Sequence, residues 1–149
     1  MMSRHGGRAG WSLVELLVAM VSAAVLSLTV GAMLVFTCRA WQRHLALADM
    51  QGDVRVAVPT LCMAIRESRA SEARTNGTQL ILGRRVFSRS GRRLMYDPDT
   101  NVVNNDAVLS RDRVTDFRYT LGTNAVWFRL VLQEQGATVD IDSRAFFRN

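Results

Sequence analysis

Hydrophobic residues form one long run near the N-terminus of the chain. Apolar and small residues continue from Trp11 to Phe36, and Glu15 is the only formally charged residue among them. At about 1.5 Å per residue, a helix of this length crosses a hydrocarbon layer of ~30 Å with some tilt. We therefore expect a membrane-spanning helix over residues 11–36.

The chain shows no turn signal after this run, but the spacing of its apolar residues changes. Steps of three or four residues connect Leu47, Met50, Val54, Val58, Leu61 and Ile65. Such steps place side chains on one face of an amphipathic helix. We expect the same helix to continue through 37–76, with a kink at Pro59, an end near Arg74 and a stop signal at Asn76-Gly77.

Beyond Gly77 the pattern changes to short segments with a period of two residues. Strands are expected at 78–82, 86–88 and 94–96, and again where apolar residues alternate from Phe117, Val126 and Val139. Turn-forming residues separate them at 89–92, 97–107, 122–124 and 135–136. One apolar face over 77–149 predicts an antiparallel meander that covers the helical stripe, which makes the fold class α+β.

The composition fits one domain preceded by a membrane helix. The chain has 149 residues, and all 19 of its Lys and Arg residues are arginine. A net charge of +6 is compatible with binding to nucleic acid or to an anionic surface. However, Asp and Glu are interspersed with the arginines, so the overall charge alone does not indicate such a partner.

Five arginines lie close together within the predicted hairpin. They are Arg84, Arg85, Arg89, Arg92 and Arg93. Such a cluster can grip DNA phosphates. The alternative is a solvated face, or ion pairs with acidic residues of a neighbouring subunit. We favour the alternative because no aromatic stacking platform flanks the cluster.

The remaining chemistry-bearing residues indicate neither catalysis nor metal binding. Cys38 and Cys62 would lie about 36 Å apart on one continuous helix, which excludes a disulfide within one subunit. Cys62 is interpreted as a small core residue, with a bridge between subunits as the alternative. The sequence contains no nucleophile–base pair, metal-ligand cluster or phosphate loop, so we expect no enzyme activity, no cofactor and no metal.

Glu15 is the residue of the apolar run that most needs an explanation, because a carboxylate within a membrane is costly. An ordinary membrane anchor gives it no role. A cleaved secretory signal is a second interpretation, but its apolar core usually spans only ~7–15 residues. A third interpretation comes from the residues on both sides of the start of the run.

Gly10 followed by Trp11-Ser12-Leu13-Val14-Glu15-Leu16 resembles the type III signal of type IV pilins and type II secretion pseudopilins. The resemblance implies that 1–10 is a cytoplasmic leader and that prepilin peptidase cleaves between Gly10 and Trp11. It also implies that Trp11 becomes N-methylated. The family usually has Phe or Met at this place. It often has a mid-run proline in its major members, and the lack of one here fits a minor component.

In that family the glutamate promotes assembly, and the resemblance assigns this role to Glu15. Cleavage would expose a positive amine on Trp11, and the carboxylate of an incoming subunit would pair with the amine of its neighbour. The expected partners are prepilin peptidase, other pilin or pseudopilin subunits, inner-membrane lipid and the inner-membrane assembly platform. A protonated carboxyl group without a partner is the alternative.

The C-terminal half carries a second resemblance. The hairpin, the segment Val108–Phe117 and a long final hairpin ending at Phe146-Phe147 resemble the W-type minor pilins and the J-type minor pseudopilins. This implies a pilin-like fold and a single-pass protein of the bacterial inner membrane, whose C-terminal domain is periplasmic until it enters a filament. The competing hypothesis is a stand-alone membrane protein whose outer β domain binds a ligand or DNA.

Overall fold

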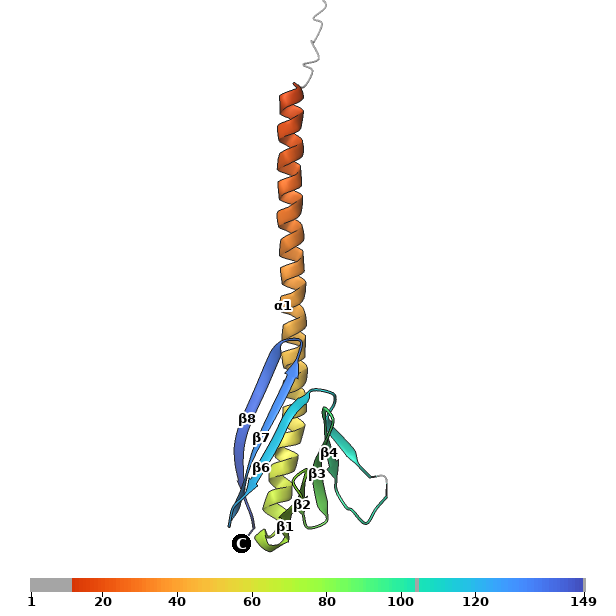
Figure 1. The fold of residues 1–149 in the computed structure, drawn as a ribbon, viewed down its shortest axis with the longest axis vertical. Coiled ribbons are helices and arrows are strands. Elements are labelled where there is room, and N and C mark those ends of the chain that lie inside the picture. Colours follow the sequence, from red (N-terminus) through yellow and green to blue (C-terminus); the bar gives the residue numbers. More distant parts are fainter. Residues whose placement is uncertain (1–11, 104, 149) are drawn as a thin grey trace, which may run out of the picture. The chain divides into compact units, whose positions relative to one another are not determined.

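The computed structural model describes residues 12–103 and 105–148 and divides the chain into two units, 1–41 and 42–149 (Figure 1). Its helical elements are α1 (Leu13–Glu67) and the short 3₁₀ helix η1 (Ala70–Glu72). Its strands are β1 (Ala73–Thr75), β2 (Gln79–Leu82), β3 (Arg85–Ser90), β4 (Arg93–Asp97), β5 (Ala107–Ser110), β6 (Val114–Leu121), β7 (Ala125–Glu134) and β8 (Ala137–Phe146). The layout is therefore α+β, as expected.

In the first unit, α1 exposes its apolar side chains along the described length. By length and composition, α1 is long and apolar enough to cross a membrane. The hydroxyl groups of this segment donate to backbone carbonyls one turn earlier: Ser22 to Val18, Ser27 to Ala23, Thr29 to Leu26 and Thr37 to Met33. These local hydrogen bonds satisfy the hydroxyl donors without water, which suits a helix surrounded by lipid.

In the second unit, α1 runs through Pro59 and ends at Glu67, which is earlier than the predicted end near Arg74. The next residue, Ser68, is buried, and its hydroxyl donates to the carbonyl of Ala64 at 2.7 Å. Beyond η1, β1 pairs with β2 in an antiparallel ladder. The prediction of helix up to residue 76 was therefore wrong, because pairing in a sheet satisfies the backbone of this segment instead.

The stop signal at Asn76-Gly77 serves as the turn between β1 and β2. The Asn76 side-chain oxygen accepts hydrogen bonds from the amides of Thr78 and Gln79 at 3.3 and 2.9 Å. Gly77 has a φ of +90°, a conformation that side chains other than glycine rarely adopt. Asn76-Gly77 interrupts regular secondary structure as expected, but the element that it ends is a strand and not the helix.

The strands form two sheets rather than the single meander that was predicted. One has the order β1-β2-β3-β4-β5 and the other β6-β7-β8, and all neighbouring strands are antiparallel. The break lies at 111–113, where Asp112 has a φ of +52°. Val114 then donates its amide to the carbonyl of Arg92, and β6 pairs with β7 instead of β5.

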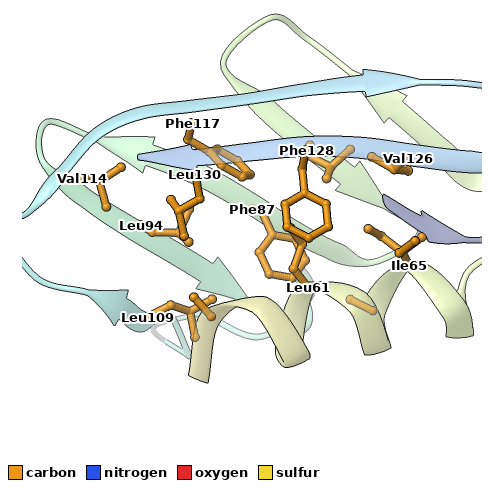
Figure 2. Packing of buried hydrophobic residues seen from close by; sticks show 14 of the residues in the cluster. Leu61, Ile65, Phe87, Leu94, Leu109, Val114, Phe117, Val126, Phe128 and Leu130 are labelled. Atoms are coloured by element: carbon orange, nitrogen blue, oxygen red, sulfur yellow. The ribbon is translucent and has the colours of Figure 1, made fainter. Parts of the chain in front are cut away.

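The core lies between the C-terminal part of α1 and the two sheets (Figure 2). Met50, Leu61 and Ile65 of α1 are buried, and Leu47, Val54 and Val58 pack against the same cluster. This confirms the predicted stripe. Phe87 from the larger sheet and Phe128 from the smaller one meet above Leu61 in the same cluster. Phe87 also stacks on Tyr96, with ring centroids 4.7 Å apart.

Candidate functional site

The start of α1 holds the charged residue that the sequence singled out. Ser12 precedes the helix, and its hydroxyl oxygen accepts a hydrogen bond from the backbone N–H of Glu15 at 3.2 Å. Ser12 is therefore the N-cap, and Glu15 lies in the first turn, where the helix dipole favours a negative charge. The Ser-x-x-Glu signature of a capping box was present in the sequence, but its capping role was overlooked. Gly10 and Trp11 lie outside the described residues.

Glu15 has no charged partner within the described part of the chain, where the ion pairs all involve other residues. Its side chain is exposed, and so are the apolar side chains that follow it on α1. Small residues recur at steps of four after Glu15: Ala19, Ala23, Ser27 and Gly31. Small side chains allow another helix to approach closely in a membrane. The arrangement thus offers an unpaired carboxylate at the end of a surface suited to helix packing.

Each of the five arginines of the hairpin contacts an acceptor within the chain: three pair with carboxylates and two donate to backbone carbonyls. Arg84 pairs with Asp99 at 4.0 Å, Arg85 with Glu67 at 2.6 Å and Arg93 with Asp112 at 3.0 Å. Arg89 donates to the carbonyl of Thr115 at 2.6 Å and Arg92 to that of Gln133 at 2.7 Å. Three of the five arginines are therefore ion-paired, but with carboxylates of the same subunit rather than of a neighbour.

Arg113 joins three segments that are distant in sequence. Its guanidinium contacts Asp49 at 3.1 Å and Asp53 at 3.4 Å on α1, and it also pairs with Glu134 at the end of β7. Ser110 donates to Asp53 at 2.7 Å. Burial alone would lower the pKa of Arg113, but the carboxylates, Glu134 foremost, raise it above its usual value. The guanidinium therefore stays charged and ties α1 to the connection between the two sheets.

A surface patch on the smaller sheet was not anticipated. Trp127 of β7 and Phe146 of β8 are exposed, and Arg144 lies over both rings, at 5.8 and 4.5 Å from their centroids. A Cβ atom at Gly122 would lie 2.3 Å from the Trp127 ring, so glycine is needed there for the ring to pack. The available signal was the position of Trp127, an aromatic residue on the polar side of an alternating strand.

We expect the neighbouring pair of Arg129 and Asp140 to make stability depend on pH. Two hydrogen bonds of 2.9 and 2.5 Å link them, and the bond from Arg129 holds the pKa of Asp140 below its usual value. A carboxyl group with a lowered pKa in the folded state stabilises the fold above its unfolded pKa. This contribution is lost as the pH falls through the folded pKa.

We therefore expect Asp140→Asn to weaken the decline of thermal stability on acidification below about pH 4, the range set by an ordinary aspartate. Melting temperatures of the full chain in detergent, recorded between neutral and acidic pH, measure this. Asp106→Asn is the control, because Asp106 is exposed and forms no ion pair among the described residues. If both variants show the same acid response as the parent, the ion pair has no role in it.

No protein-family model, no curated protein and no solved structure matches the chain. Within the described residues, no group of three or more His, Cys, Asp or Glu side chains is placed to hold a metal ion.

Proposed function

We propose that the protein is a minor pilin or pseudopilin, a structural subunit that initiates or caps a type IV pilus or a type II secretion pseudopilus. The observation that carries the proposal is the spacing of Gly10 and Glu15 directly before a long apolar helix. The architecture is compatible with this role. The helix begins at Leu13, and its C-terminal part packs on antiparallel sheets, as in a pilin-like fold.

In this proposal, prepilin peptidase hydrolyses the peptide bond between Gly10 and Trp11 on the cytoplasmic side and then methylates the new amine. The amine of Trp11 remains positively charged at neutral pH. Glu15 of an incoming subunit pairs with the amine of a neighbour, and in a low dielectric each charge is costly without the other. The exposed carboxylate of Glu15 and the small residues behind it support this arrangement.

The proposed location is the inner membrane, with α1 embedded and the β domain in the periplasm until assembly. The partners are prepilin peptidase, the assembly platform and other pilin-like subunits, whose apolar helices pack beside α1 in the filament. The hydroxyl groups of the apolar segment of α1 already form hydrogen bonds within the helix. Among the polar groups of this segment, the carboxylate of Glu15 is therefore the one that a partner would stabilise most.

Mass spectrometry of the protein isolated from its own cells tests the proposal. We expect the mature chain to begin at N-methylated Trp11. Gly10→Val should block cleavage and leave the leader attached, because the peptidase cuts after this glycine. Gly7→Val, a matched change within the same leader, should still be processed. An intact start at Met1 or Met2 in the native protein would overturn the assignment.

A second candidate function is a stand-alone membrane protein whose β domain binds a ligand. The exposed rings of Trp127 and Phe146, both in contact with Arg144, favour it, because aromatic and arginine side chains dominate many binding surfaces. An unprocessed N-terminus combined with ligand binding that is lost in Trp127→Ala would support this function. For DNA as the ligand, affinity should fall steeply with salt.

A further inference from the structure

The C-terminal part of α1 carries a second apolar stripe that faces away from the sheets. Its members follow one another at steps of three or four residues and are all exposed: Leu45, Ala48, Gly52, Val56, Pro59 and Met63. We call them the outer stripe. The exposed fractions of Leu45, Val56 and Met63 are 51%, 55% and 60%. These values show that neither sheet covers them.

The outer stripe lies on the opposite side of the helix from the core. Successive residues of a helix are rotated by about 100° around its axis. Around that axis, the members of the outer stripe fall within a sector of roughly 80°, whose centre lies about 170° from the buried stripe. No charged residue interrupts it between Leu45 and Met63. Over 18 residues of rise, it is about 27 Å long. A Cβ atom at Gly52 would meet nothing within 4 Å, so the middle of the outer stripe is open to the close approach of another helix.

Charges of opposite sign border the outer stripe on its two sides. Asp49 and Glu67 lie along one border, and Arg55 and Arg66 along the other. Asp49 and Glu67 contact Arg113 and Arg85 through Oδ2 and Oε2, which leaves the second oxygen of each carboxylate available. Arg55 and Arg66 form no ion pair among the residues described.

This distribution of charge selects the orientation of a partner helix with the same pattern. When two such helices pack stripe to stripe in parallel, the acidic border of each faces the basic border of the other. An antiparallel pair would set acid against acid and base against base, which is unfavourable. In a parallel pair without stagger, Glu67 of one copy lies at nearly the same height as Arg66 of the other.

We propose that the outer stripe is the contact surface for a second copy of this chain, packed in parallel and in register through Leu45–Met63. Parallel packing is also the orientation of two chains anchored in one membrane by the same end. Heptad-like steps with small residues between larger ones suit such packing. The proposal goes beyond the function given above, because it needs neither cleavage by prepilin peptidase nor a filament.

Disulfide crosslinking of the full chain in membranes tests the proposal, with Cys38 and Cys62 replaced by alanine. Gly52→Cys and Met63→Cys should each give a covalent dimer of the chain after mild oxidation. Gln51→Cys is the matched control, because this exposed neighbour of Gly52 points about 100° away from the outer stripe. Equal dimer yields from Gln51→Cys and Gly52→Cys would overturn the proposal.

The orientation is tested by mixing two variants in one membrane. Mixed disulfides between Leu45→Cys and Met63→Cys chains form only in an antiparallel pair, so their appearance would refute the parallel arrangement. Crosslinks from Gly52→Cys to a different protein, without dimers of this chain, would refute a second copy as the occupant. Arg66→Glu should lower the dimer yield severalfold, whereas Arg118→Glu, at an exposed arginine of β6 in the smaller sheet, should not.

Failure of this proposal is distinguishable from failure of the pilin assignment. Crosslinking should persist in the Gly10→Val background, in which the leader stays attached. If crosslinks form while the native N-terminus is unprocessed, the proposed contact through the outer stripe is supported and the pilin assignment is contradicted. If processing occurs but the crosslinks do not form, the pilin assignment is supported and the proposed contact is contradicted.

Discussion

Replacing Glu15 by alanine is expected to leave cleavage at Gly10 largely intact and to reduce incorporation of the protein into filaments by roughly 100-fold or more. Removing one member of a buried ion pair costs about 3–5 kcal/mol, and each ~1.4 kcal/mol corresponds to a factor of ten in equilibrium. The expectation rests on the proposed amine partner of Glu15. Quantitative immunoblotting of sheared filaments against the membrane fraction measures the change.

Two further variants separate the charge of Glu15 from its place in the helix. Glu15→Gln keeps the size of the side chain and the helical start but removes the charge, so it should be as defective as Glu15→Ala. Ser12→Ala removes the N-cap hydroxyl, which costs ~1 kcal/mol of helix stability, but keeps the carboxylate. It should assemble far better than either Glu15 variant. Normal assembly of Glu15→Gln would contradict the proposed role of the carboxylate.

Replacing Phe87 by alanine is expected to lower the free energy of unfolding of the β domain by about 3–5 kcal/mol. The Phe87 side chain is 0% exposed, it stacks on Tyr96, and it belongs to the cluster that joins α1 to both sheets. Its removal leaves a cavity at this junction, and the surrounding side chains relax only in part. Denaturant titration of the full chain in detergent, followed by tryptophan fluorescence, measures the loss.

Phe146→Ala is the matched control for this variant. Phe146 is also a phenylalanine on a strand, but it is 53% exposed, and the Arg144 guanidinium carbon lies 4.5 Å from its ring centroid. Its removal should cost about 1 kcal/mol or less, because little apolar area is withdrawn from water there. Equal losses from the two variants would contradict the assignment of Phe87 to the core and of Phe146 to the surface.

The elements with a strong local pattern were predicted well from the sequence. The stripe that includes Met50, Leu61 and Ile65 is buried as expected, because its spacing fixes one face of a helix whatever packs on it. The hairpin of β7 and β8 turns at Gln135-Gly136, where both residues have positive φ. Such two-residue turns are encoded locally by their own conformational preferences.

Features that depend on contacts between distant segments could not be predicted in the same way. The end of α1 at Glu67 follows from the pairing of β1 with β2, which competes with the helix for the same residues. The ion pairs of Arg113 with Asp49 and Asp53 join positions about 60 residues apart. No spacing in the sequence marks them, because they form only when the connection between the two sheets crosses α1.

The sequence by itself determined the apolar helix with one carboxylate near its start, the buried stripe and the presence of alternating strands, because these are periodic or compositional properties. The tertiary structure alone decided that the strands divide into two sheets and that the hairpin arginines contact acceptors in their own chain. It also decided which apolar residues of α1 remain uncovered. Burial and ion pairing depend on which segments meet in space, and that is set by the packing of the whole domain.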